Sequence, residues 1–301
     1  MAFRKFVEPC KSVTLNKKIL AMNKPFEPVG VCIYCGSTEQ LTDEHIVPYG
    51  LNGDLTLPQA SCTTCNRITS LFEQKVLRGP MSEARIVGKL KTRNKKERPT
   101  SIRLNLIRAD ESVEQLDIPA DDAMAFLPML ILTEASFPYG HPACSGIQIK
   151  ALETLKFGRD VAELLVDKNA VGISGRTRIH PQVFGQLLAK IAYSYHVGVK
   201  GRFPMSESPA LALLKGEVKD ISNWIGSTFL PVSPASSTGL HRLATKTVVK
   251  SDGSSVELVL IQLFANAGTC TYEVVVRAKD WMAYLQPAPA APGPHSQPTL
   301  A

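Results

Sequence analysis

Apolar residues recur at helical spacing in the second half of the chain. Intervals of three, four and seven residues place them on one face of an α-helix; they are Val183, Phe184, Leu187, Leu188, Ile191 and Tyr195. The pattern predicts an amphipathic helix over residues 180–196, with its apolar face toward a protein core.

Apolar and β-branched residues dominate three shorter segments that follow this helix. Residues 244–249 and 256–264 predict strands, and Asp252-Gly253 between them is typical of a hairpin turn. A third strand is predicted over residues 271–276, which gives an antiparallel meander with one face against helices. The histidines of this region are assigned to surface or helix-capping positions: His141, His180, His196 and His241.

Nothing in the sequence predicts a membrane span or a secretory signal. The longest apolar run, residues 123–132, has about half the length that a bilayer requires and contains Pro128. Residues 1–24 carry six Lys or Arg and no apolar signal-type stretch. We therefore expect a cytoplasmic protein that does not bind membranes. Residues 287–301 are rich in Pro and Ala and predict a disordered tail.

The formal net charge of +7 is unevenly distributed. Residues 1–24 carry +5, residues 25–66 carry −5, residues 67–103 carry +8, and the remainder carries −1. Basic segments on both sides of an acidic one suit a protein that grips a phosphate backbone and holds a cation against it. A solvated basic surface is the alternative interpretation.

Four of the seven cysteines form two C-x-x-C pairs, Cys32/Cys35 and Cys62/Cys65. In a reducing compartment such pairs indicate metal binding rather than disulfides. Four thiolates match the tetrahedral preference of structural zinc, and the 26 residues between the pairs leave room for a β-hairpin. We predict one structural Zn²⁺; a redox role for either pair is the alternative. The other three cysteines are interpreted as small buried residues: Cys10, Cys144 and Cys270.

Polar residues of a second kind lie between and just after these pairs. Asp43-Glu44-His45 supplies a carboxylate next to an imidazole, and the following Ile46-Val47-Pro48 favours a strand. Neighbouring side chains on a strand point to opposite faces. Glu44 and His45 can therefore share a site only where the strand twists or turns. Asn66 follows the fourth cysteine, where its side-chain oxygen could cap a helix or bind a metal.

The order C-x-x-C, acid-His, C-x-x-C-Asn resembles the HNH endonucleases of the ββα-metal type, in particular their zinc-containing branch. The resemblance covers residues 30–80 approximately. It implies that Glu44 and Asn66 hold a catalytic Mg²⁺ or Mn²⁺ and that His45 is the general base that activates water. Hydrolysis of a phosphodiester needs both a base and a cation, so the residue set is chemically coherent.

Two departures from the family pattern concern the loop and the helix. Many members have an Asn in the loop before the second cysteine pair, where Asn52 is the nearest candidate here. Many also end with a His on the helix, which this chain lacks. Glu73, seven residues after Asn66, is the candidate replacement. It would accept a hydrogen bond from His45 or a metal-bound water, or else lie exposed near Arg67 or Arg78.

Basic residues after the motif are expected to contact phosphates without reading sequence. They are Arg67, Lys89, Lys91, Arg93, Lys95, Lys96 and Arg98. The expected partner is nucleic acid, and the resemblance favours DNA.

The expected fold is α+β, with a treble-clef-like ββα-metal zinc domain followed by an α+β domain that contains the meander. The expected divisions are a basic segment (1–29), the zinc nuclease domain (30–82), a basic connector (83–103), the α+β domain (104–286) and the tail (287–301). We expect a metal-dependent endonuclease, in the manner of restriction or phage-defence enzymes. Two alternatives remain open: a non-catalytic zinc-dependent nucleic-acid-binding protein, and a sensor whose C-terminal domain controls the nuclease.

Overall fold

The structure is a computed structural model, and it describes residues 11–12, 26–232 and 240–285. The predicted tail and most of the basic N-terminal segment lie outside these residues, as does Cys10. The helices are α1 Thr63–Leu77, α2 Ser82–Val87, α3 Val161–Asp167, α4 Pro181–Lys200, α5 Pro209–Lys215 and α6 Trp281–Tyr284. The strands are β1 Lys11–Ser12, β2 Leu41–His45, β3 Thr56–Cys62, β4 Ser101–Ile107, β5 Val113–Pro119, β6 Met124–Leu132, β7 Ile149–Gly158, β8 Gly172–Ser174, β9 Ile225–Thr228, β10 Arg242–Val249, β11 Ser255–Gln262 and β12 Thr271–Arg277.

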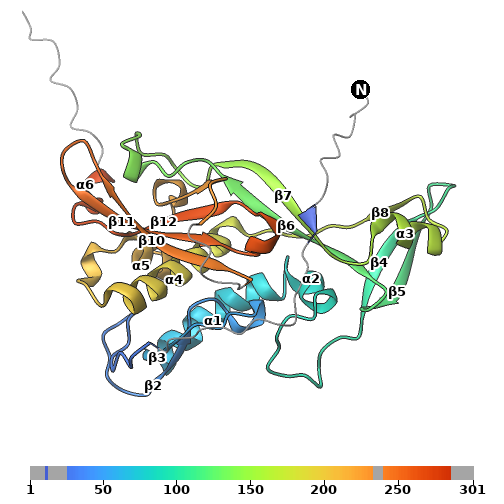
Figure 1. Cartoon of the computed structure of the whole chain (residues 1–301), viewed down its shortest axis with the longest axis horizontal. Coiled ribbons are helices and arrows are strands. Elements are labelled where there is room, and N and C mark those ends of the chain that lie inside the picture. The colour runs from blue at the N-terminus through green and yellow to red at the C-terminus, as the bar shows by residue number, and fades with distance from the viewer. Residues whose placement is uncertain (1–10, 13–25, 233–239, 286–301) are drawn as a thin grey trace, which may run out of the picture.

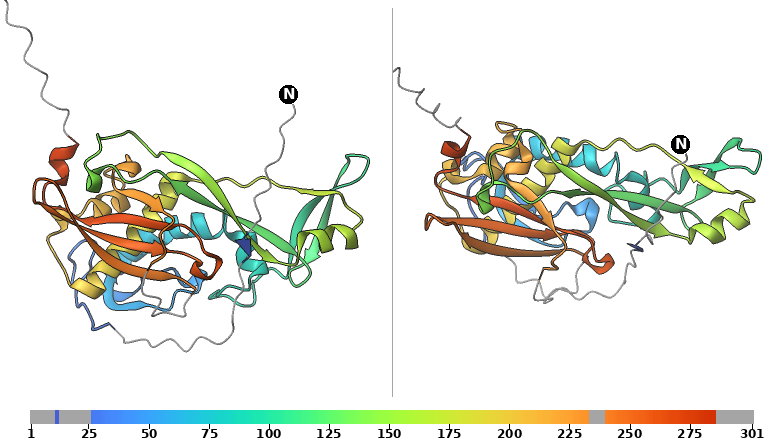
Figure 2. Two further views of the ribbon diagram at one scale, coloured as in Figure 1. Left: turned by 45° about the horizontal axis from the view of Figure 1, so that its top comes forward. Right: turned by 90° about the horizontal axis from the view of Figure 1, so that it is seen from above.

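The described strands form four sheets, in the orders β1-β7-β6, β10-β11-β12-β9, β2-β3 and β5-β4-β8. Every pairing among them is antiparallel except that of β1 with β7. Figures 1 and 2 show β4, β5, β8 and α3 at one end of the molecule, with the meander, α4 and α5 at the other. Mixed helices and antiparallel sheets confirm the predicted α+β fold class.

A ββα unit, β2 to α1, carries the chemical motif. β2 and β3 form a hairpin in which Leu41 lies opposite Cys62, and α1 begins directly after β3. A register shift between Thr42 and Glu44 twists β2 near its end. The strand expected over Ile46-Val47 is wrong, because β2 ends at His45. Beyond His45 the chain turns at Pro48 into a single 3-10 turn over Tyr49–Leu51, in which the Leu51 N–H donates to the Pro48 carbonyl at 2.9 Å.

The meander lies where the sequence predicts it, with β9 added as a fourth strand beside β12. The predicted hairpin turn is present: the Lys250 N–H donates to the Ser254 carbonyl at 2.8 Å, and Gly253 has a φ of +80°. β11 stops two residues before the predicted end. Phe264 there adopts a φ of +54°, which turns the chain out of the sheet.

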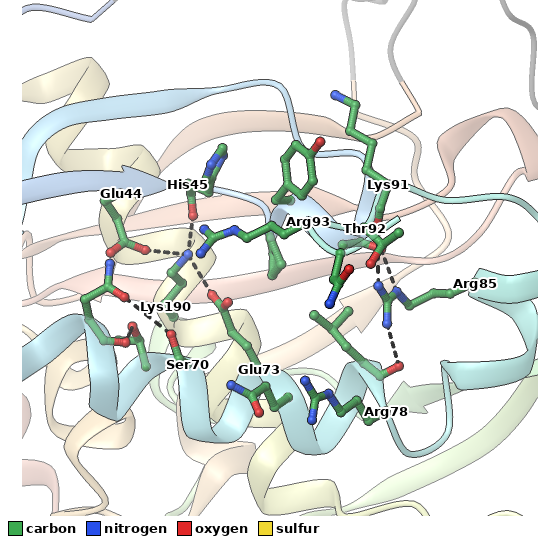
Figure 3. Close-up of a pocket in the computed structure, with 18 of the residues that line it drawn as sticks. Glu44, His45, Ser70, Glu73, Arg78, Arg85, Lys91, Thr92, Arg93 and Lys190 are labelled. Carbon is green, nitrogen blue, oxygen red and sulfur yellow. Dashed lines mark hydrogen bonds and ion pairs between the residues drawn. The ribbon is translucent and has the colours of Figure 1, made fainter. Parts of the chain in front are cut away.

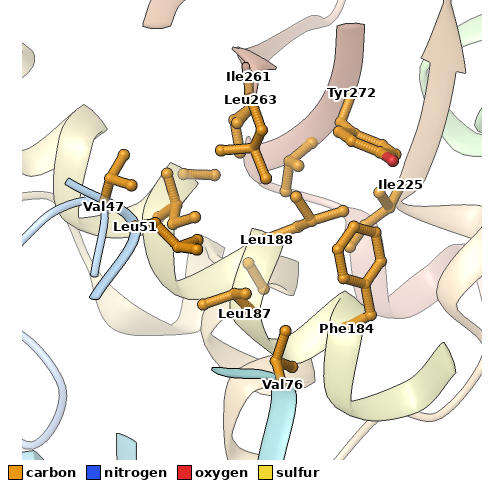
Figure 4. Packing of buried hydrophobic residues seen from close by; sticks show 14 of the residues in the cluster. Val47, Leu51, Val76, Phe184, Leu187, Leu188, Ile225, Ile261, Leu263 and Tyr272 are labelled. Carbon is orange, nitrogen blue, oxygen red and sulfur yellow. The ribbon is translucent and has the colours of Figure 1, made fainter. Parts of the chain in front are cut away.

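Helix α4 begins where it was predicted, with His180 as the N-cap residue, and extends one turn further to Lys200. Its apolar face lies between the ββα unit and the meander. In Figure 4, Leu187 and Leu188 lie between Val47, Leu51 and Val76 on one side and the meander residues Ile225, Ile261, Leu263 and Tyr272 on the other. Leu187 and Leu188 are fully buried, and each contributes about 1.5–3 kcal/mol by its burial.

One continuous hydrophobic core therefore spans the ββα unit and the C-terminal body. The domain boundaries expected at 82/83 and 103/104 stay a prediction. The basic connector is not a plain linker, since α2 lies within it and its Ala84, Val87 and Leu90 join the core.

The surface or capping assignment is wrong for two of the four histidines. His196 is 1% exposed and pairs with Glu257 at 2.6 Å. His241 lies between the ββα unit and the meander, where its Nε2 donates to the Leu51 carbonyl at 2.6 Å and its Nδ1 accepts from the Phe264 N–H. The polar ring nitrogens of these histidines were expected to face solvent. In the structure they instead form hydrogen bonds with partly buried protein groups. Among the described helices, none combines the length and apolar character needed to cross a membrane.

Candidate metal centre and adjoining pocket

The four paired cysteines meet at one point of the ββα unit. Their sulfur atoms all lie within 4.8 Å of one another, and the sulfurs of Cys35 and Cys62 are 3.7 Å apart. A tetrahedral zinc site with Zn–S bonds of about 2.3 Å has sulfurs about 3.8 Å apart. The cluster therefore fits Zn²⁺ in both ligand type and spacing, and it can hold a metal as the sequence predicted.

Local backbone geometry explains how each pair presents its sulfurs. In the first turn the Gly36 N–H donates to the Cys32 carbonyl, and Gly36 has a φ of +81°, a conformation that favours glycine. In the second, Cys62 is the N-cap of α1, and its sulfur accepts from the Cys65 N–H at 3.4 Å. That hydrogen bond is the largest cause that lowers the pKa of Cys62 to about 7, the other three cysteine thiols adding to it, and the shift favours the thiolate that zinc binds.

A pocket of about 300 Å³ lies beside this centre, between the end of β2, one face of α1 and the segment around Lys91. Glu44, His45, Asn66 and Glu73, the four candidate catalytic residues, all line it. Five cationic and three acidic side chains line the pocket, which leaves a net charge of +2 with histidine neutral. The sequence-predicted set is thus brought together around one electropositive hollow.

Lys190 of α4 is a lining residue that the sequence analysis missed. Its ammonium group is 2.5 Å from Glu44 Oε1 and 2.9 Å from Glu73 Oε1, and its side chain is 1% exposed (Figure 3). It also donates to the carbonyl oxygens of His45 and Ile46. Burial lowers the pKa of Lys190, but Glu44 and Glu73 outweigh this effect, and the net shift is upward. The lysine therefore remains a fixed buried cation.

Glu44 is nearly as buried as its partner, at 3% exposure. Burial raises the pKa of this carboxyl, and the ion pair with Lys190 acts in the opposite direction. Together Glu44, Glu73 and Lys190 carry a net charge of −1, so the trio still attracts one further cation.

His45 leaves β2 in a different direction from Glu44. Figure 3 shows Glu44 pointing toward Lys190, whereas the imidazole points away from it. The ring lies 5.6 Å from the Tyr49 ring, and its Nδ1 is 3.4 Å from Thr56 Oγ1. Burial lowers the pKa of His45, and Lys190 and Arg93 lower it further. A neutral imidazole at neutral pH is the form that can accept a proton.

Asn66 lies one turn into α1, where its side chain bridges helix and hairpin. Its Nδ2 donates to Thr42 Oγ1 at 3.3 Å, and its Oδ1 accepts from Ser70 Oγ at 3.4 Å. The neighbouring Asp43 has a structural role, since its carboxylate accepts from the Gln59 N–H at 3.1 Å. Asn66 lines the pocket, and its Oδ1 keeps a second lone pair beside the one that accepts from Ser70.

Glu73 does not lie in the exposed position considered from the sequence. It is not an exposed helix carboxylate near Arg67 or Arg78, because its side chain is 19% exposed and pairs with Lys190. No hydrogen bond between Glu73 and His45 occurs among the described interactions, although the carboxylate is close enough to raise the pKa of His45. Its role in chemistry stays a prediction, and its contact with the buried ammonium is what the structure adds.

The seven basic residues expected to contact phosphates divide into two groups. Lys91 and Arg93 line the pocket, and Figure 3 shows the Arg93 guanidinium reaching over it toward Lys190. The remaining five lie outside the pocket: Arg67, Lys89, Lys95, Lys96 and Arg98. Lys89 pairs with Asp121 at the surface, and Arg98 donates to the Leu90 carbonyl. Of these seven residues, Arg93 alone lines the pocket without an ion pair in the described part of the chain, since Lys91 pairs with Asp54.

Two polar residues fix the segment that carries Lys91 and Arg93. Asn52, with a φ of +64°, accepts from the Lys91 N–H at 2.6 Å, which suits the loop-fixing Asn that the family pattern suggests. Arg85 donates to the carbonyls of Gly50, Leu77 and Lys91 at 2.8, 3.1 and 3.3 Å. Three of its five N–H donors bind backbone, so Arg85 fixes the pocket wall.

Comparison with known proteins adds no relative: neither a protein-family model, nor a curated protein, nor a solved structure matches this chain.

Proposed function

We propose that the chain is a metal-dependent endonuclease of the HNH type that hydrolyses phosphodiester bonds in nucleic acid, with DNA as the expected substrate. One observation carries the proposal: Glu44, His45 and Asn66 reach a single electropositive pocket from a ββα unit built around a four-cysteine cluster. The residue types, their order along the chain and their convergence all suit phosphodiester hydrolysis.

A catalytic Mg²⁺ or Mn²⁺ would be held by Glu44 and Asn66. Mg²⁺ is commonly held by one or two carboxylates together with phosphate oxygens of the substrate. The net −1 of the carboxylate–lysine trio and the amide oxygen of Asn66 suit such a shared site. When bound, the ion would stabilise negative charge on the phosphate and on the leaving oxygen.

Proton transfer, phosphate binding and positioning are assigned to the protein's own side chains. Neutral His45 takes a proton from the attacking water. Arg93, exposed at the pocket mouth, binds and orients the phosphate, and a guanidinium can do so through two hydrogen bonds. Lys190 holds the ends of β2 and α1 in register by contacting Glu44, Glu73 and the carbonyl oxygen of His45.

A plasmid-nicking assay tests the proposal. Zinc-loaded full-length protein should nick plasmid with added Mg²⁺ or Mn²⁺ and should not nick without them. His45→Ala should lower the rate by about 10²- to 10⁴-fold, the usual contribution of a general base. His141→Ala, at an exposed histidine paired with Glu134, is the matched control and should keep the wild-type rate. Wild-type nicking by the His45 variant would exclude the proposed base.

A second candidate function is a zinc-stabilised nucleic-acid-binding protein that does not cut. The observation that favours it is the ammonium of Lys190, which already neutralises part of the charge that would draw a catalytic ion. The same assay separates the two, since this candidate requires DNA binding without nicking under any divalent metal.

A further inference from the structure

A larger hollow adjoins the His45 pocket at the C-terminal part of α1. It encloses about 1110 Å³ between the C-terminal part of α1, the start of α2, strands β4, β6 and β8, and the segment that leads into α4. This volume exceeds the range of about 300–1,000 Å³ typical of small-molecule pockets. We call it the basic groove. It is lined by residues that the proposed catalysis does not use.

The rim of the groove is cationic. Lys75, Arg78, Arg176 and Arg178 line it and are exposed, and no ion pair of these four occurs in the described part of the chain. Arg103 also lines the groove but spends its charge on Asp117, with two hydrogen bonds of 2.9 Å. Glu83 also lines the groove, and four cations without an ion pair against this one carboxylate leave the rim positive, which favours a polyanionic ligand.

The floor of the groove is apolar and contains one exposed aromatic ring. Phe126 of β6, 40% exposed, lies among Leu104, Met124, Ala125, Pro128 and Ile173. Cationic rims combined with an exposed aromatic ring are the features with which proteins bind single strands: phosphates contact the cations and bases stack on the ring. A duplex would keep its bases inside and leave this floor unused.

The basic groove and the His45 pocket share a wall. Gln74 and Arg78 of α1 line both hollows, so the two adjoin along the C-terminal part of this helix. From Asn66 to Leu77 the helix rises about 17 Å, which corresponds to about five nucleotides at the spacing of a duplex strand.

We propose that the nucleic acid bound at the His45 pocket continues as a single strand along α1 into the basic groove, where Lys75, Arg78, Arg176 and Arg178 hold its phosphates and Phe126 stacks on a base. The proposal rests on the proposed function, since it names the form of that substrate. It assigns a binding role to β6, β8 and the segment before α4, which lie outside the ββα unit.

The test measures binding of fluorescent DNA hairpins that carry single-stranded tails of 0, 5, 10 or 15 nucleotides at the 5′ or the 3′ end. Binding is measured without added Mg²⁺, so that no cleavage is needed. Tails longer than about five nucleotides should tighten binding for one tail polarity. Arg176→Gln/Arg178→Gln should remove most of that gain and lower the log–log salt slope by about 1.4, at roughly 0.7 per phosphate on a single strand.

Matched variants separate the groove from general charge effects. Lys215→Gln/Lys219→Gln removes two exposed cations elsewhere and should leave the tail-dependent gain and the slope unchanged. Phe126→Ala should weaken tail binding by roughly 5- to 150-fold, the range for losing one stacked base. The arginine variant should bind and nick tail-less substrates like wild type.

Three results would overturn the proposal: no dependence on tail length, equal affinity for duplex extensions, or saturation by free mononucleotides with no gain from longer strands. Failure of the proposed function looks different, because a chain that never nicks could still show the tail-dependent binding. Conversely, if the substrate is nicked but neither binding nor rate depends on the tails, the proposed role of the basic groove is excluded and the proposed nuclease activity stands.

Discussion

Replacing Lys190 by Met removes the buried ammonium group and keeps an unbranched side chain of similar length. In the wild type this group contacts two carboxylates and two backbone carbonyl oxygens, and it is 1% exposed. The substitution leaves Glu44 at 3% exposure with no cation beside it. The carbonyl oxygens of His45 and Ile46 lose a donor at the same time.

The expected loss is large on the scale of a whole domain. Breaking a buried ion pair by removing one partner costs about 3–5 kcal/mol, whereas domains are stable by only about 5–15 kcal/mol. At about 2.1 cal/mol/K per residue, a chain of 301 residues has an unfolding entropy of about 0.6 kcal/mol/K, so 3 kcal/mol corresponds to a fall in Tm of about 5 °C. Glu73 contributes less than Glu44 to the loss, because its side chain is 19% exposed and solvent screens it in part.

Urea denaturation, with and without Mg²⁺, measures this effect. Lys190→Met vacates a site between two carboxylates, so Mg²⁺ should bind the variant more tightly than the wild type and stabilise it more, by about 1.4 kcal/mol for each tenfold difference in Kd at saturating metal. Adding Glu73→Gln to Lys190→Met should recover part of the loss by removing one unpaired charge. Lys215→Met, at an exposed position, is the control. A Lys190 variant within 1 kcal/mol of wild type would refute the reasoning.

Three further predictions concern zinc, the helix carboxylate and pH. Cys62→Ser should abolish stoichiometric zinc in elemental analysis and unfold the ββα unit, because metal binding supplies folding free energy in such units. Glu73→Gln should lower the nicking rate by ten- to a hundred-fold if the carboxylate orients groups around the proposed metal; a rate within twofold of wild type would deny it that part. Burial lowers the pKa of His241 to about 4 in the folded chain. Between pH 6.5 and 4 the imidazole is therefore protonated in the unfolded chain but neutral in the folded chain. The free energy of unfolding should therefore fall as pH drops through this window, by at most about 3 kcal/mol and by less because the residue is partly exposed. Urea melts of His241→Gln should lack this component.

Much of the ββα unit and its cysteine cluster could be predicted, because the sequence patterns that specify them are local. Two C-x-x-C pairs fix a four-thiolate centre, and the spacing between them leaves room for the hairpin that β2 and β3 form. The meander could be predicted equally well, because turn residues such as Asp252-Gly253 separate its strands. Residues close in sequence decide each of these features, and local patterns therefore suffice.

The role of Lys190 could not be predicted from such local patterns, although its position in the sequence was unusual. It lies seven residues after Val183 and three after Leu187, on the apolar face of the predicted helix. Lysine is almost never fully buried unless it is paired, so a lone cation on that face predicts a buried acid. Which acid it meets depends on how α4 packs against the ββα unit, and no local pattern specifies that contact. His196 and His241 were misassigned for the same reason.

Helix α4 also makes the geometry of the pocket a property of the whole chain. On one side Lys190 contacts Glu44, and the Tyr193 hydroxyl donates to the Ile33 carbonyl at 2.9 Å. On the opposite side Tyr195 donates to the Leu243 carbonyl at 3.1 Å, and His196 pairs with Glu257. Consecutive turns of α4 thus contact both Glu44, the candidate metal ligand, and the meander. Because packed cores transmit displacement rather than absorb it, a ligand that shifts β10 or β11 would move the ammonium beside Glu44. In the alternative in which the C-terminal region controls the proposed nuclease, α4 would be the element that connects the two.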